Sequence, residues 1–127
     1  MEDLQKAWQQ LTAPGAPFAW SVRDVAGRPM RTYDTAPPSL RTIWELSRAH
    51  GDKDYLLYGD ERITYAEAHD KVARIAAYLA SRGVERGDRV AIAMRNYPEW
   101  ALTYWATIPL GATSVGMNAW GTGRSEE

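Results

Sequence analysis

The sequence predicts an α/β fold that contains a strand, helix, strand unit with parallel strands. The segment 90–94 is apolar without alternation, which is typical of a strand covered on both faces. Residues 100–108 continue as a helix that Pro109 and Gly111 end, and residues 113–117 form the next strand. Because a right-handed crossover places two such strands parallel, we expect this βαβ unit to be part of a parallel sheet.

An arm and a linker are expected over residues 1–17. Apolar residues recur there at helical spacing, and the segment 13–17, Ala-Pro-Gly-Ala-Pro, ends the helix. The apolar positions are Leu4, Ala7, Trp8 and Leu11. Residues 18–33 show no clear period and contain a turn at 27–29.

A second helix is expected to begin after a proline pair. Ser39 follows Pro37-Pro38 and is suited to be the N-cap, while Gly51 can adopt the left-handed conformation that closes a helix. Its apolar stripe consists of Leu40, Ile43, Trp44 and Leu46.

A hairpin and a capped helix follow. Segments 55–58 and 62–65 flank a turn at 59–61, and Thr64 with Glu67 forms a T-x-x-E capping box. The helix then presents one continuous apolar face, made of Ala68, Val72, Ile75, Ala76 and Leu79, and Gly83 ends it. A turn at Arg86-Gly87-Asp88 leads into the strand at 90–94, after which Asn96 can cap the next helix and Pro98 fits its first turn.

Composition excludes several classes of protein. The 127 residues amount to one domain or less and carry a net charge of −1, which gives no basic field for nucleic acid. With no cysteine, disulfides, thiolate metal sites and cysteine nucleophiles are excluded. The acidic N-terminus resembles no secretory or transit peptide, so we expect a cytoplasmic protein.

One uncharged stretch requires a choice between two structures. Residues 100–123 carry no charge and are long enough to cross a membrane. Prolines, glycines and hydroxyl side chains interrupt this stretch, which favours a buried helix followed by a buried strand, with a membrane helix as the alternative.

Glycine and serine motifs indicate no catalytic site. Gly111 and Gly116 have phosphate-loop spacing, but Met117 stands where that loop needs lysine. The segment 121–123, Gly-Thr-Gly, lacks the third glycine of a dinucleotide fingerprint. Ser114 lies in an elbow-like segment, but neither histidine nor aspartate follows it in the chain.

Histidines, carboxylates and tryptophans are assigned ordinary roles. His50 and His69 are expected to be solvated helix residues, and no H-E-x-x-H motif is present. The acid pairs Asp52 with Asp54 and Asp60 with Glu61 lie beside turns, where solvated acids are common. Trp8, Trp20, Trp44, Trp100, Trp105 and Trp120 are assigned to packing, with ligand stacking as the alternative. We therefore assign no catalytic, cofactor-binding or metal-ligating residue.

The order of the segments resembles the start of the adenylate-forming (AMP-binding) superfamily, specifically the fatty-acid CoA ligases (long-chain acyl-CoA synthetases). The matching passages are A-P-P-S-L-R at 36–41, D-E-R-I-T-Y-A-E at 60–67, G-V-E-R-G-D-R-V-A at 83–91, N-Y-P-E-W at 96–100, L-G-A at 110–112 and N-A-W at 118–120. Pro109 and Gly121 depart from the family's pattern.

The resemblance implies an enzyme that forms an acyl adenylate from a carboxylic acid and ATP, and then passes the acyl group to CoA, with Mg²⁺ assisting. It implies that residues 18–120 are the opening part of the family's large N-terminal domain and that 121–127 are a truncated or divergent tail. The family's phosphate loop, ribose-binding acid and catalytic lysine lie beyond the matched part, so we expect an inactive fragment that binds no cofactor alone.

Two other functions remain open. The chain could be a stand-alone α/β interaction module, pairing with a ligase subunit or with itself through an exposed apolar strand edge. A dinucleotide-binding domain is the third hypothesis. Acyl-chain length is not predicted, because the family's pocket-forming segments lie beyond the matched part.

Overall fold

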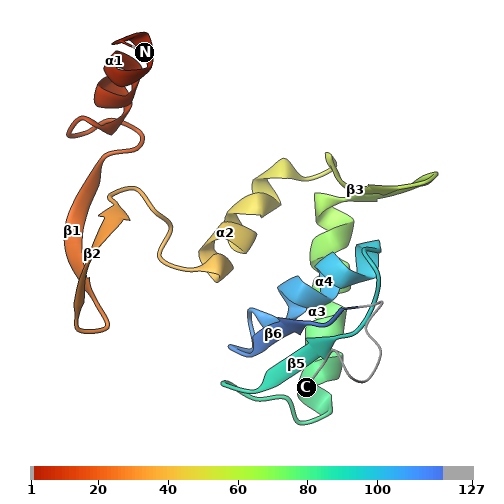
Figure 1. The fold of residues 1–127 in the computed structure, drawn as a ribbon. Helices are drawn as coiled ribbons and strands as arrows, with labels where there is room; N and C mark the ends of the chain where they lie inside the picture. The colour runs from red at the N-terminus through yellow and green to blue at the C-terminus, as the bar shows by residue number, and fades with distance from the viewer. Residues whose placement is uncertain (1, 119–127) are drawn as a thin grey trace. The chain divides into compact units, whose positions relative to one another are not determined.

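The computed structural model describes residues 2–118 (Figure 1). Two compact units are distinguished, an N-terminal unit, Met1–Pro38, and a C-terminal unit, Ser39–Glu127. The elements are α1 (Glu2–Thr12), β1 (Trp20–Val25), β2 (Arg28–Tyr33), α2 (Leu40–Leu46), the 3-10 helix η1 (Ser47–His50), β3 (Asp54–Tyr58), β4 (Glu61–Thr64), α3 (Tyr65–Ser81), β5 (Arg89–Ile92), α4 (Pro98–Thr107) and β6 (Thr113–Gly116).

The N-terminal unit contains the expected helix and a hairpin that we did not predict. β1 and β2 pair antiparallel, from Trp20 opposite Tyr33 to Val25 opposite Arg28. Ala26 and Gly27 form the turn with φ of 52° and 79°, as a two-residue hairpin turn with two left-handed residues requires. The turn expected at 27–29 was thus misplaced, because Pro29 lies within β2, in a two-stranded sheet where every strand is an edge.

The start of the C-terminal unit confirms the predicted caps. The Ser39 hydroxyl accepts a hydrogen bond from the Thr42 amide at 3.1 Å, and η1 extends α2 to Gly51, whose φ is 52°. Both halves of the capping box form at α3, with Thr64 accepting from the Glu67 amide and the Glu67 carboxylate accepting from the Thr64 amide.

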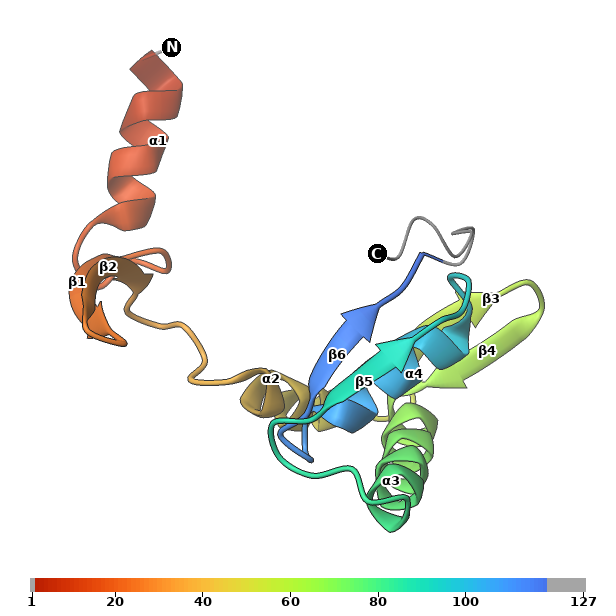
Figure 2. The same ribbon diagram turned by 60° about the horizontal axis from the view of Figure 1, so that its bottom comes forward.

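The predicted βαβ unit is present. β5 and β6 pair parallel, with Val90 opposite Ser114 and Ile92 opposite Gly116. Figure 2 shows this pair beside α4, which contacts both strands. The prediction that both faces of the first strand are covered is wrong: Val90 and Ile92 are shielded, but Ala91 between them is exposed. Burial alternates along β5 because α4 covers only one face of the strand. The strand also ends at Ile92 rather than at residue 94.

The boundaries of α4 differ slightly from the expected ones. Its N-cap is Tyr97, which makes no side-chain capping bond, so the cap assigned to Asn96 was wrong. Pro98 occupies the first turn, as predicted, because its missing N–H has no helical partner there. The following strand ends at Gly116, one residue before the predicted end.

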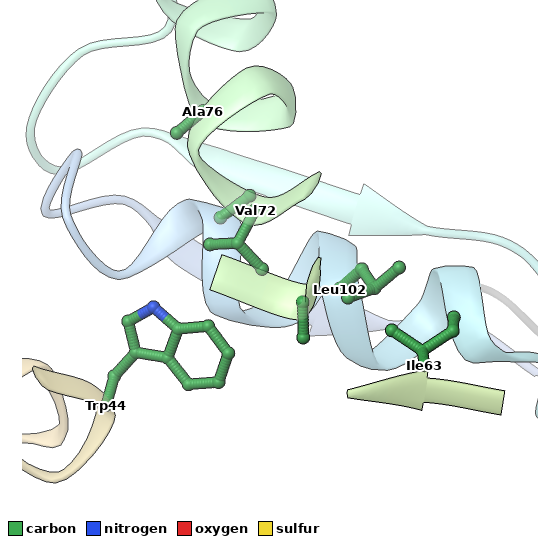
Figure 3. Packing of buried hydrophobic residues seen from close by; sticks show 7 residues of the cluster. Trp44, Ile63, Val72, Ala76 and Leu102 are labelled. Atoms are coloured by element: carbon green, nitrogen blue, oxygen red, sulfur yellow. The ribbon is translucent and has the colours of Figure 1, made fainter. Parts of the chain in front are cut away.

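The core of the C-terminal unit gathers residues from α2, β4, α3 and α4 (Figure 3). Figure 3 labels Trp44, Ile63, Val72, Ala76 and Leu102, which come from these four elements and belong to one buried cluster. Each is at most 8% exposed, and Ala68 and Ala106 are fully buried between the helices. The close approach of α3 to α4 depends on these alanines, because larger side chains would hold the helices apart.

Of the helices within residues 2–118, none combines the length and the apolar character that a membrane crossing requires. In place of the membrane helix considered for residues 100–123, the structure has α4 followed by β6. The expectation that this strand is buried is wrong, because Thr113 and Gly116 are exposed and the two residues between them are half-buried. Residues 119–123 lie outside the described part.

Candidate functional site

The carboxyl ends of β5 and β6 meet at one edge of the C-terminal unit. The Met117 amide donates to the Ile92 carbonyl at 3.1 Å, so the segments that follow β5 and β6 leave the sheet side by side. In open α/β sheets, ligands bind outside the carboxyl ends of the strands. This edge is therefore the candidate binding edge of the chain.

A small cavity of about 170 Å³ lies between β3 and the beginning of α4. Its polar groups are the Asn96 amide and the phenols of Tyr58 and Tyr97, whose rings meet edge to face with centroids 5.4 Å apart. Leu56, Leu57, Pro98 and Ala101 complete its lining. These groups can donate and accept hydrogen bonds and can pack against an apolar ligand, but they include no nucleophile with a base beside it, so the cavity is suited to binding.

Small residues hold α4 close to the sheet. A Cβ atom on Gly116 would lie 3.5 Å from the Trp100 ring, which therefore packs directly over β6. Thr107, fully buried, donates to the Tyr104 carbonyl at 2.7 Å, so its oxygen accepts from the Ser114 hydroxyl. The Ser114 hydroxyl therefore makes a structural hydrogen bond. This agrees with the prediction that Ser114 is not a nucleophile.

Four ring-bearing residues, Trp44, Tyr55, His69 and Trp105, form what we call the aromatic cluster. The Trp44 indole stacks against His69 at 4.0 Å and against Trp105 at 4.8 Å between centroids. The Trp105 Nε1–H donates to the Tyr55 hydroxyl at 2.6 Å. Burial raises the pKa of Tyr55, and the cluster links α2, β3, α3 and α4.

His69 is 4% exposed, so the expectation of a solvated histidine was wrong. Ser47 Oγ donates to the Trp44 carbonyl at 2.6 Å, so the contact of 3.0 Å to His69 Nε2 requires the proton on Nε2. Nδ1 is buried and has no hydrogen-bond partner. Burial, aided by the Arg48 guanidinium, lowers the pKa of His69. The pair does not activate Ser47, because the serine proton is already donated to a carbonyl.

The other predicted candidates have the ordinary environments expected for them. His50 is exposed and contacts the Tyr65 ring with centroids 4.7 Å apart. Asp52, Asp54, Asp60 and Glu61 are all exposed, and Asp54 forms an ion pair with Arg62 across the hairpin.

Gly111 ends a helix as expected, and Gly116 lies in the strand where it was expected. Gly111 follows α4 with φ of 68°, as a helix-ending residue does, and Gly116 is the last residue of β6. Trp120, the segment 121–123 and the expected tail at 121–127 lie outside the described residues.

The part of the chain that the structure describes contains no group of three or more His, Cys, Asp or Glu side chains able to hold a metal ion.

Sequence reasoning missed the cavity beside the binding edge. Asn96 was interpreted as a cap, and Tyr58 and Tyr97 belong to a strand end and a loop that are distant in the chain. Tyr58 adjoins a turn and Tyr97 adjoins the start of a helix. No sequence pattern predicts that these two side chains are in contact, so only the tertiary structure shows it.

Comparison with known proteins identifies relatives. The sequence model of the AMP-binding enzyme family matches residues 43–125. A medium/long-chain-fatty-acid–CoA ligase of Mycobacterium tuberculosis is 40% identical over 81 residues, covering 63% of this chain and 14% of the ligase. Acetyl-coenzyme A synthetase of Sinorhizobium fredii is 47% identical over 70 residues, covering 55% of this chain and 10% of the synthetase. The chain thus spans only a small part of the curated relatives it matches.

Solved structures share the fold. The N-terminal subdomain of Klebsiella oxytoca NpsA, in complex with anthranilyl-AMSN, has a TM-score of 0.66 and 28% identity, covering 68% of this chain and 23% of that one. O-succinylbenzoate coenzyme A synthetase of Bacillus subtilis, in complex with AMP, has a TM-score of 0.61 and 29% identity, covering 65% and 22%. The predicted α/β class with a parallel strand pair is confirmed, and the chain belongs to the AMP-binding enzyme family.

Proposed function

We propose that this chain forms the opening part of an ATP-dependent acid–CoA ligase. Such an enzyme joins a carboxylate to the α-phosphorus of ATP with release of pyrophosphate, and then transfers the acyl group to the thiol of CoA. The observation that carries the proposal is the β5–α4–β6 unit with its binding edge, which lies within the family match at 43–125.

In this proposal the described residues position the binding edge and do not perform the chemistry. The packing of Trp100 over Gly116 and the Thr107–Ser114 hydrogen bond fix α4 against β6. No catalytic group is assigned to residues 2–118, so the 127 residues alone are expected not to form an adenylate, and Mg²⁺, ATP and CoA are expected to act with the longer enzyme. Because ATP and CoA are used, a cytoplasmic location is part of the proposal.

A fatty acid is the proposed substrate class. Its support is the 40% identity to the medium/long-chain-fatty-acid–CoA ligase, which covers more of this chain than the match to acetyl-coenzyme A synthetase does.

A chimaera tests the proposal. Residues 43–125 replace the matching segment of the Mycobacterium tuberculosis ligase, and acyl-CoA formation is measured with decanoate and with acetate. We expect activity with decanoate, and none in a matched chimaera that carries Ile92→Asp, because that residue is 1% exposed in the core. A folded but inactive chimaera contradicts the proposal. Pyrophosphate release by the 127-residue chain itself contradicts the proposed inactivity.

An interaction module is the second candidate function. The observation that favours it is the β5–β6 pair, which is a two-stranded sheet among the described residues and exposes Ala91 on one face. Through this sheet the chain would associate with itself. Light scattering after size-exclusion chromatography is expected to show a mass that rises with concentration, whereas a monomer at all concentrations contradicts self-association.

A further inference from the structure

The N-terminal unit contains a cavity that lies outside the family match. It has a volume of about 240 Å³ and is lined by Trp8 of α1, Trp20 of β1, and Arg31, Thr32 and Tyr33 of β2. The family match begins at residue 43, so this cavity is not part of the site described above.

Backbone hydrogen bonds hold the walls of the cavity together. The Phe18 amide donates to the Leu11 carbonyl at 3.1 Å, which joins the end of α1 to the chain entering β1. The Asp34 amide donates to the Ala19 carbonyl at 2.8 Å, and Thr35 Oγ1 donates to the Pro17 carbonyl at 3.1 Å. The hairpin is thereby closed at its base, next to the helix that supplies Trp8.

The cavity combines aromatic walls with one cation. Trp20 and Tyr33 are opposite each other in the hairpin register, and the Arg31 Cζ lies 4.5 Å from the centroid of the Trp20 ring. Within residues 2–118, no carboxylate pairs with Arg31, whereas Arg23 on the neighbouring strand pairs with Asp34 at 3.1 Å. A guanidinium held over an aromatic ring is oriented and remains able to bind a carboxylate through two parallel hydrogen bonds.

Apolar surface continues from the cavity along α1. Leu11, Trp8 and Leu4 occupy one stripe of the helix and are 43%, 59% and 77% exposed. Exposed apolar side chains in one stripe are suited to cover an alkyl chain, because burial of each CH₂ group contributes about 0.8 kcal/mol. An aromatic acid would fill the cavity but leave this stripe uncovered.

We propose that this cavity binds a medium-chain or long-chain carboxylate, with the carboxylate on Arg31 and the alkyl chain between Trp8 and Trp20 and along α1. The proposal identifies a binding site separate from the ligase reaction and does not depend on the proposed function. Its ligand can come from free fatty acid or from fatty acid in a membrane, because both present the same head group and chain.

Equilibrium dialysis of radiolabelled decanoate against the full chain tests the proposal. We expect saturable binding that Arg31→Gln weakens at least about tenfold, the loss of one charge-assisted contact. Trp8→Ala should also weaken it, while Arg28→Gln, at the start of the same strand but outside the cavity lining, should not. Circular dichroism verifies that the variants remain folded, and Arg31→Lys should recover part of the affinity because it keeps the charge.

Competitors and vesicles distinguish the chemistry and the source of the ligand. Decanol should compete poorly, since it lacks the carboxylate. If the membrane is the source of the ligand, phosphatidylcholine vesicles that contain oleate should retain the chain, and Arg31→Gln should abolish this retention. If free fatty acid is the source, the chain should bind decanoate in solution but not these vesicles. Absence of saturable binding below about 1 mM, equal affinities of Arg31→Gln and Arg28→Gln, or stronger competition by benzoate than by decanoate overturns the proposal.

Discussion

His69 shows how burial decides what an imidazole can do. In sequence it is one of two histidines without a metal-binding motif, but in the structure its ring stacks on Trp44 and its Nε2 contacts Ser47 at 3.0 Å. Nδ1 has no acceptor for a second proton, so the folded chain favours the neutral ring. The charged groups near this ring are Arg48, Glu45 and Asp70, and the effect of Arg48 adds to that of burial.

We predict that acid weakens the fold through His69. Because its pKa is lowered in the folded state, the unfolded chain takes up the proton first as the pH falls below about 6.5, and the free energy of unfolding decreases there. Above that pH both states hold the neutral ring, and the contribution of His69 is constant. Urea unfolding followed by tryptophan fluorescence at pH 5.5 and 7.5 measures the difference.

His69→Gln should reduce this dependence on pH. His50→Gln, at an exposed histidine of the same unit, is the control and should leave it unchanged. If the free energy of unfolding of His69→Gln depends on pH as that of the unmodified chain does, His69 is not the cause of the acid effect.

Gly111 is the second residue whose role is decided locally. Its φ is 68°, and a Cβ atom there would lie 3.1 Å from Cγ of Arg86. We predict that Gly111→Ala lowers the free energy of unfolding by about 1–2 kcal/mol through the left-handed backbone, with a further loss from the close contact with Arg86. Thermal and urea unfolding measure it.

Gly83→Ala provides a matched comparison, because Gly83 has φ of 88° with open space around it. Gly83→Ala should lower the free energy of unfolding only by the cost of the left-handed backbone. The additional cost in Gly111→Ala should disappear when Arg86→Ala is combined with it, and a persistent difference would show that Arg86 is not its cause.

At the scale of elements, local signals explain most helix boundaries. Thr64 and Glu67 satisfy two amides at the start of α3, and hydrogen bonds from Thr64 lower the pKa of the Glu67 carboxyl. Glycine ends α3, with Gly83 in the left-handed region. Local sequence determines the burial of strands less well. In β5, buried and exposed residues alternate because α4 covers one of its faces.

The capping box yields a prediction for α3. Thr64→Ala removes the acceptor for the Glu67 amide and should lower the free energy of unfolding by about 1 kcal/mol. Thr64→Ser keeps the hydroxyl and should lose only a small part of this. Equal losses in the two variants, measured by urea unfolding, would mean that the threonine acts through its methyl group rather than as a cap.

At the scale of the whole molecule, the two units differ in how much they bury. Among residues 2–38, Ala19 is the one buried hydrophobic residue, whereas the core of the C-terminal unit contains residues of α2, β4, α3 and α4. Trp44 attaches α2 to that core, since Leu40, Ile43 and Leu46 of the same helix remain exposed. The C-terminal unit therefore contains the main cooperative core among the described residues.

We predict that Trp44→Ala destabilises this unit by about 3–5 kcal/mol, the range for removal of a buried large aromatic side chain. Trp8→Ala, at a tryptophan that is 59% exposed, should change the free energy of unfolding by about 0.5 kcal/mol or less. Calorimetry or urea unfolding of both variants checks the contrast. Similar losses in the two variants would contradict the assignment of the core.

Much of the candidate site could not be predicted from the sequence. The strand and helix that form the binding edge follow from apolar runs, prolines and glycines that act within a few residues. The contact of Tyr58 with Tyr97 and the cavity at Trp8 and Trp20 depend on long-range packing, for which the sequence contains no periodic signal. The hairpin at β1 and β2 was missed for a local reason, since Pro29 is unusual inside a strand.

The sequence by itself determined the α/β class, the parallel strand pair, the caps of α2 and α3, and the membership in the AMP-binding enzyme family. These depend on local backbone preferences and on the order of short passages, which the sequence states directly. Only the tertiary structure decided the burial of His69, the single covered face of β5 and the cation over Trp20. Burial and ion pairing are set by which distant residues exclude water from a side chain, and no single passage of the chain contains that information.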